Sequence, residues 1–151
     1  MLFRSATDGI TNDPGLVIRN QEPDAAIEYS VNGGPWASTY APVEGRNRVR
    51  VRQIDLAGNV SKPSKPFVFR LDTRVDPLFP LVFAQAAQSG AAAGSRSQRF
   101  TGVEWGAAVQ YSLDGGQTWV RKQPYAALRG QVLLRQIDLA GNISAVTGFA
   151  S

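Results

Sequence analysis

The sequence predicts an all-β protein built from two tandem copies of one small β-sandwich. Three observations carry this prediction: a long internal repeat, apolar residues that alternate with polar ones, and Asn-Gly or Asp-Gly turns between the alternating stretches. Several short strands separated by regular turns are typical of a sandwich. With 151 residues, the chain is long enough for two small domains.

The internal repeat runs through both halves of the chain. Residues 52–61 read Arg-Gln-Ile-Asp-Leu-Ala-Gly-Asn-Val-Ser, and residues 135–144 repeat them with one change, Val to Ile, 83 positions later. Upstream, residues 27–34 match residues 109–116 at an offset of 82, so one residue is inserted between the two matches. Two long matches in the same order indicate a duplicated unit of about 70–80 residues.

We therefore expect repeat 1 over residues 1–72 and repeat 2 over residues 77–151. The linker, residues 73–76, is short and polar and precedes a proline, which disfavours helix in the residue before it. So short a linker should limit the freedom of the two repeats. Residues 84–98 are dominated by Ala, Gly, Ser and Gln, and we expect a loop there.

The segment around residue 50 shows the strand pattern clearly. Val49 and Val51 alternate with Arg48, Arg50 and Arg52. Successive side chains of a strand point to opposite faces of its sheet, so the valines should be buried and the arginines exposed.

The repeated Asp-Leu-Ala-Gly-Asn segment predicts a tight turn that is closed by its own aspartate. Asp55 shares strand parity with the buried valines, so its carboxylate can turn back and accept backbone N–H groups of the turn. Gly58 should then take a positive φ, and Asp138 and Gly141 should do the same in repeat 2. A metal-ligand role for Asp55 is the alternative, although a lone carboxylate makes a poor calcium site.

The composition excludes several kinds of chemistry. The chain has no cysteine and no histidine, which removes disulfides, thiolate metal sites, the commonest general base and the commonest zinc ligand. It has no phosphate-binding loop, nucleophile elbow or metal-spaced cluster. We therefore expect neither an enzyme nor a bound cofactor. No apolar run is long enough to cross a membrane, so we expect no membrane insertion. We also expect the chain to be a monomer.

Four motifs in a fixed order carry a family resemblance. They are Thr-Asp-Gly-Ile-Thr-Asn-Asp-Pro at 7–14, Tyr-Ser-Val-Asn-Gly-Gly at 29–34, the segment 51–61 and Leu-Asp-Thr at 71–73. Together they resemble the bacterial immunoglobulin-like repeats of large surface adhesins and biofilm-associated proteins. The resemblance covers nearly all of repeat 1, and repeat 2 from about residue 100. It implies two immunoglobulin-like β-sandwich domains that act as a structural or adhesive spacer.

The same resemblance suggests partners, a location and a metal. The partners are neighbouring repeats of a longer exported chain, and the location is extracellular or at the bacterial cell surface. The beginning of the chain lacks the apolar stretch of a signal peptide, which agrees with a piece of a longer protein. Some family members bind calcium at module junctions, which makes Asp72 and Asp76 candidate ligands, and Asp8 and Asp13 weaker ones.

The alternative function is a ligand-binding module for a glycan or another anionic polymer, from a phage tail or a secreted carbohydrate-active protein. Its candidate surface is basic: Arg48, Arg50 and Arg52 project from one strand face, and Trp105, where repeat 1 has Pro23, adds an aromatic ring. Cations beside an aromatic ring can grip such a polymer. The competing interpretation is a solvated strand face on a chain of net charge +4.

Residues 112–119, Ser-Leu-Asp-Gly-Gly-Gln-Thr-Trp, also resemble the Asp-box of sialidases and related propellers. That motif is a structural hairpin. A propeller needs several blades of four strands each, and this chain is too short for one.

Overall fold

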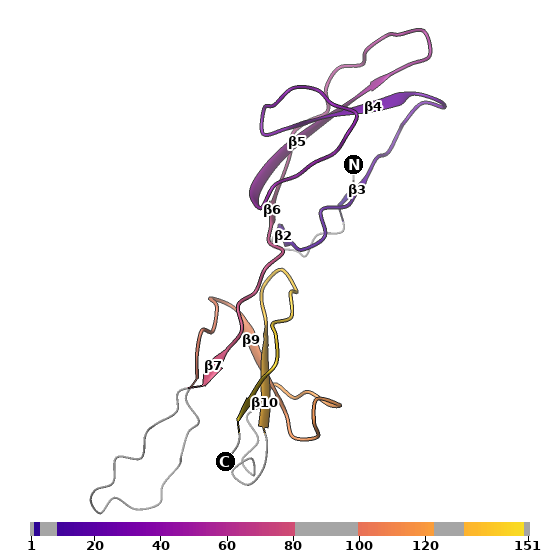
Figure 1. Cartoon of the computed structure of the whole chain (residues 1–151). Coiled ribbons are helices and arrows are strands. Elements are labelled where there is room, and N and C mark those ends of the chain that lie inside the picture. The colour runs from indigo at the N-terminus through magenta and orange to yellow at the C-terminus, as the bar shows by residue number, and fades with distance from the viewer. Residues whose placement is uncertain (1, 4–8, 81–99, 123–131, 150–151) are drawn as a thin grey trace, which may run out of the picture. The chain divides into compact units, whose positions relative to one another are not determined.

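The computed structural model describes residues 2–3, 9–80, 100–122 and 132–149 of the chain (Figure 1). The chain divides into two compact units, Met1–Arg74 (unit 1) and Val75–Ser151 (unit 2). Within the described residues, all regular structure is β, with eleven strands and no helix, which confirms the predicted all-β class. Accordingly, this part of the chain offers no helix long and apolar enough to cross a membrane. The loop expected over 84–98 lies outside the described residues.

Unit 1 contains a four-stranded sheet and a separate two-stranded pair. The sheet has the order β2 (Ile10–Thr11), β6 (Phe67–Leu71), β5 (Gly45–Ile54) and β4 (Ala26–Val31), and the pair joins β1 (Leu2–Phe3) to β3 (Leu16–Val17). Neighbouring strands are antiparallel except β2 and β6, which are parallel.

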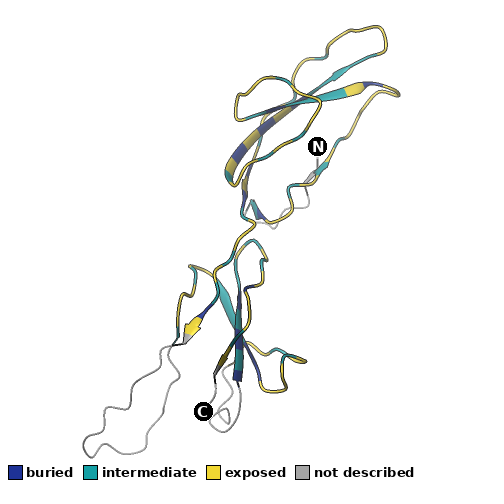
Figure 2. Cartoon of the chain, viewed as in Figure 1, coloured by how far each residue is buried: buried dark blue, intermediate teal, exposed yellow. Residues whose placement is uncertain are grey.

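The longest strand, β5, is one of the two inner strands of this sheet, and its side chains alternate between exposed and buried from Arg46 to Val51. Asn47, Val49 and Val51 are buried, whereas the arginines between them are exposed, and Figure 2 shows this as alternating dark and yellow bands along β5. Burial of the valines drives the strand onto the core. Asn47 is fully buried and keeps its hydrogen bonds, accepting the Val43 backbone N–H at 2.9 Å.

The core of unit 1 lies between the sheet and the segment that carries β3. Its buried cluster consists of Val49, Val51, Phe69 and Leu71. From outside the sheet, Leu16 and Ile18 are among the partly buried side chains packed against this cluster. Unit 1 therefore has apolar side chains from two layers meeting in one core.

Unit 2 has a three-stranded sheet and its own two-stranded pair. The sheet has the order β11 (Thr147–Phe149), β10 (Val132–Ile137) and β9 (Ala108–Ser112), and the pair joins β7 (Phe79–Pro80) to β8 (Phe100–Thr101). The buried cluster consists of Leu78, Tyr111, Val132 and Leu134, with Phe100 and Val109 packed against it.

Candidate functional site

The outer face of β5 carries a row of arginines. Arg46, Arg48 and Arg50 are exposed, and Arg52 is half-buried. Arg52 lies opposite Glu28 of β4 and binds it through two nitrogens, Nη2 to Oε2 at 2.6 Å and Nε to Oε2 at 2.7 Å. Arg46, Arg48 and Arg50 keep the positive charge of the row on the surface.

Trp36 completes this face. Backbone hydrogen bonds between Tyr29 and Ala37, at 2.8 and 3.0 Å, continue the β4 hairpin and set Trp36 next to Ser30. Ser30 in turn pairs with Arg50 across the sheet. The guanidinium of Arg52 stands over the Trp36 ring, 4.5 Å from its centroid, in a cation–π contact.

Beside this stack lies a hollow of about 300 Å³. It is lined by Ser30, Gly33, Gly34, Trp36, Arg48 and Arg50. The two glycines belong to the tight turn after β4, where Gly33 has a φ of 79°. Two guanidinium groups that donate hydrogen bonds, next to an indole ring, suit a sugar or polymer unit bearing a carboxylate, sulfate or phosphate.

The structure adds an aromatic partner for the arginines. Trp105, the ring expected from the sequence, belongs to unit 2, where it is 89% exposed. Trp36 is the aromatic ring on the arginine face of unit 1. The sequence carries a signal for this position, because counting around the Asn-Gly turn puts Trp36 beside Ser30.

Unit 2 repeats the stack, but its sequence has Gln131 and Leu133 where unit 1 has Arg48 and Arg50. Arg135 stands 4.1 Å from the centroid of the Trp119 ring, and its Nε donates to Gln110 Oε1 at 2.8 Å. Leu133 occupies the place of Arg50, pairing with Ser112 as Arg50 pairs with Ser30. The residue that corresponds to Arg48, at position 131, lies outside the described residues.

The two Asp-Leu-Ala-Gly-Asn turns have the same geometry. Asp55 accepts the backbone N–H and the side-chain amide of Asn59, both at 2.8 Å. Asp138 accepts the same two groups of Asn142, again at 2.8 Å. The side-chain bond from Asn59, followed by its backbone bond, lowers the pKa of Asp55 because both bonds favour the charged carboxylate.

The glycines of these turns adopt the left-handed backbone that the sequence indicates. Gly58 has a φ of 87° and Gly141 a φ of 91°. Each glycine N–H donates to the carbonyl of the aspartate that opens the turn, at 3.0 Å in unit 1 and 3.2 Å in unit 2. The acidic side chains of these segments are therefore occupied in closing turns.

The Asp-box of unit 2 is a closed hairpin. Asp114 Oδ1 accepts the Ser112 hydroxyl at 2.7 Å and the Thr118 backbone N–H at 2.9 Å, and its Oδ2 accepts the Thr118 hydroxyl. The bonds from Thr118 and Ser112 hold the pKa of Asp114 well below its usual range. Its carboxylate is thus also used for a turn.

The calcium candidates have varied local surroundings. Asp72 accepts the Arg74 backbone N–H at 3.4 Å, the backbone N–H of Asp76 donates to Glu104 at 2.7 Å, and Asp13 accepts the Gly15 N–H at 2.9 Å. Asp8 lies outside the described residues. Over the described ranges, no three acidic side chains gather in a way that could hold a metal ion. The calcium assignment stays a hypothesis.

The sequence was also compared with known proteins. Searches against protein-family models and against curated protein sequences found no significant match to this chain.

Proposed function

We propose that the chain is a non-enzymatic spacer: two immunoglobulin-like β-sandwich modules of a longer exported protein at a bacterial surface. The observation that carries the proposal is that both units use the same frame. Each closes a turn with an Asp–Asn clasp, Asp55–Asn59 in unit 1 and Asp138–Asn142 in unit 2, with matching 2.8 Å bonds. A repeated frame suits a protein whose role is length and rigidity.

Force spectroscopy tests the spacer role on the full chain, held at its two ends. We expect two unfolding steps, one for each unit of 74 and 77 residues. Each step should release roughly 280 Å of chain at most, because extended chain spans about 3.3–3.6 Å per residue. A single step, or extension without resolved steps, would contradict a pair of separately folded load-bearing modules.

A second candidate function, binding of an acidic glycan, is favoured by the hollow beside Trp36. It joins an indole ring to the guanidinium groups of Arg48 and Arg50. Its volume of about 300 Å³ lies at the small end of known ligand pockets and suits one charged sugar unit rather than a folded partner. Single-stranded nucleic acid is favoured less, because such sites usually offer several stacking rings.

Binding of heparin, polygalacturonate and neutral dextran to the full chain tests this second function. We expect weak binding of the two acidic polymers that falls steeply with salt, since counterions are released as charges pair. Arg48→Gln with Arg50→Gln should abolish it, and Arg121→Gln, an exposed arginine of unit 2, is the matched control. Equal binding of dextran, or binding unchanged in the double variant, would rule the site out.

A further inference from the structure

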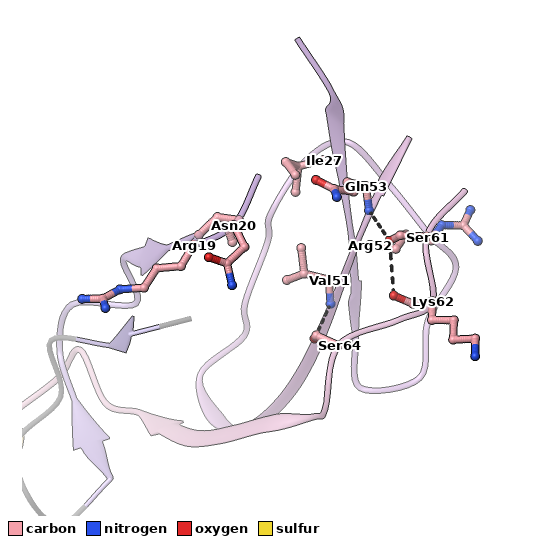
Figure 3. A pocket seen from close by; sticks show the side chains of 10 residues that line it. Arg19, Asn20, Ile27, Val51, Arg52, Gln53, Ser61, Lys62 and Ser64 are labelled. Carbon is pink, nitrogen blue, oxygen red and sulfur yellow. Dashed lines mark hydrogen bonds between the residues drawn. The ribbon is translucent and has the colours of Figure 1, made fainter. Parts of the chain in front are cut away.

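Unit 1 contains an open cavity between its sheet and residues 18–20, and the lining of this cavity includes Arg52 of the arginine row. Its volume is about 160 Å³. Figure 3 shows the side chains of Ile27 and Val51 pointing into the space between the sheet and the segment that carries Arg19 and Asn20. A cavity of about 150 Å³ with apolar walls holds a group the size of benzene. This cavity is therefore large enough for one aliphatic side chain.

In unit 2 the same position is filled by the chain itself. The duplicated sequence maps the apolar lining of the cavity onto the surroundings of Leu78: Ile18, Ile27 and Val51 correspond to Phe100, Val109 and Leu134. Leu78 is 1% exposed and is a member of the buried cluster of unit 2. It comes from Asp76-Pro77-Leu78, directly before β7.

Three polar side chains hold this segment in unit 2. Gln136 Nε2 donates to the carbonyl of Asp76 at 2.7 Å, and Glu104 Oε1 accepts the N–H of Asp76 at 2.7 Å. The Thr147 hydroxyl donates to the carbonyl of Leu78 at 2.6 Å. The segment is thus bound through its backbone at Asp76 and Leu78 and through the buried Leu side chain.

Unit 1 has the same three polar groups, but they bond elsewhere. Gln53 corresponds to Gln136, Glu22 to Glu104 and Ser64 to Thr147. Gln53 Nε2 reaches Glu22 Oε1 at 3.4 Å, a long bond, and the Ser64 hydroxyl donates to the Lys65 carbonyl. The hydrogen bond between the glutamate backbone and the glutamine side chain is the same in both units. The Glu22 N–H donates to Gln53 Oε1 at 3.0 Å, and the Glu104 N–H donates to Gln136 Oε1 at 2.9 Å.

We propose that the unit 1 cavity is a binding slot for an extended segment of the Asp-Pro-Leu type, supplied by a neighbouring repeat of the same chain. Gln53 and Ser64 would donate to its carbonyls, Glu22 would accept its N–H, and its leucine would fill the apolar part of the cavity. Each repeat would then receive part of its core from the residues ahead of it, as unit 2 does from Asp76-Pro77-Leu78. The assignment of the segment to a neighbouring repeat rests on the spacer function proposed above. The existence of the slot does not depend on that function.

The register of the two-stranded pairs fixes the test. β1 pairs Leu2 with Val17, and β7 pairs Phe79 with Thr101. The offset of 82 makes Ile18 the counterpart of Phe100, which pairs with Pro80. Extending the β1 register by one residue therefore makes Met1 the counterpart of Pro80. A copy of residues 73–79 joined directly to Met1 of the full chain therefore sets its leucine at the cavity. The matched control is the same extension with that leucine replaced by Asp.

The leucine extension should raise the Tm of unit 1 by about 5–10 °C, the shift expected for one buried leucine in a domain of this size. It should also slow amide hydrogen exchange in β5, and the Asp extension should do neither. Gln53→Ala should remove part of the gain, whereas Ser64→Thr, which copies Thr147, should keep it. Equal effects of the two extensions, or no effect of either, would overturn the slot.

Two further outcomes separate the parts of the proposal. A monomer stabilised by the leucine extension supports a segment that acts within one chain. A stabilised dimer shows that the segment enters a second copy, which overturns a neighbouring repeat of the same chain as the source. The force experiment tests the spacer function separately. If that experiment shows no pair of unfolding steps, the spacer function fails, and the Tm shifts of the two extensions still test the slot.

Discussion

At the scale of single residues, three aspartates of this protein close turns with their carboxylates. Asp55 and Asp138 each bind one asparagine four residues later through both carboxylate oxygens. Asp114 does the same for a hairpin through Ser112 and Thr118. Each carboxylate satisfies donors that the turn would otherwise leave to water, which selects one turn geometry.

Replacing either clasp should therefore weaken its own unit. We expect Asp55→Ala to lower the Tm of unit 1 and Asp138→Ala that of unit 2, each by a few degrees, because the turn loses both acceptors. Calorimetry with a chelator and with added calcium checks this. If the aspartates acted only as metal ligands, the chelated variants would melt like the chelated parent.

Asp55 and Asp114 also make stability depend on pH. The pKa values of Asp55 and Asp114 are lowered by folding, so their contribution is present above about pH 4, the unfolded value, and is lost as pH falls through the folded pKa. Without histidine, stability should be nearly flat between about pH 6 and 8. Melting curves from pH 2 to 8 test this, and a large change in Tm between pH 6 and 8 would contradict it.

At alkaline pH, Tyr40 affects the stability of unit 1. Burial, together with the neighbouring Tyr29, raises the pKa of Tyr40 to about 12. Its contribution is fully present below about pH 10 and is lost as pH rises towards 12. Tyr40→Phe, which also removes the 3.0 Å bond to the Pro14 carbonyl, should make unit 1 less sensitive to pH in this range.

At the scale of elements, strict alternation lets one strand serve two purposes. The inner face of β5 supplies Val49 and Val51 to the core, and the outer face presents arginines to solvent. The turn after β5 ends the alternation. Its isolated bridge, Ile54 to Val60, has a counterpart in Ile137 to Ile143 of unit 2.

The glycines of these turns can be tested for backbone strain alone. A Cβ added at Gly58 would meet nothing within 4 Å, so only its φ of 87° resists a side chain. Gly58→Val should cost about 1–2 kcal/mol, the usual penalty for a left-handed backbone. Gly58→Asn should cost less, because asparagine tolerates positive φ. Urea titration of both variants measures this, and equal costs would show that strain is not the cause.

At the scale of the whole molecule, the chain is two units with separate buried clusters. Leu78 is a fully buried member of the second cluster, although it comes from the segment just after the boundary between the units. We expect Leu78→Ala to destabilise unit 2 by about 2–5 kcal/mol, the usual cost of such a core deletion. Calorimetry should then show unit 2 melting earlier and unit 1 melting as before. A common shift of both transitions would contradict separate cores.

Local patterns in the sequence were sufficient for the all-β class and for the expected strand and turn chemistry. The alternation of Val49 and Val51 with arginines and the Asp-Leu-Ala-Gly-Asn segments each span a few residues, so the sequence alone displays them. The division into an immunoglobulin-like pair and its function remain proposals, as does the assignment of the arginine face to a ligand.

Only the tertiary structure decided which distant residues meet. It placed Trp36 on the arginine face and Gln136 on the backbone of Asp76, a contact between residues 60 positions apart. It also distinguished the filled core position at Leu78 from the matching cavity in unit 1. Such contacts depend on how strands pair and how layers pack, and the local alternation of apolar and polar residues does not encode either. Nearly identical repeat segments therefore lie in different surroundings.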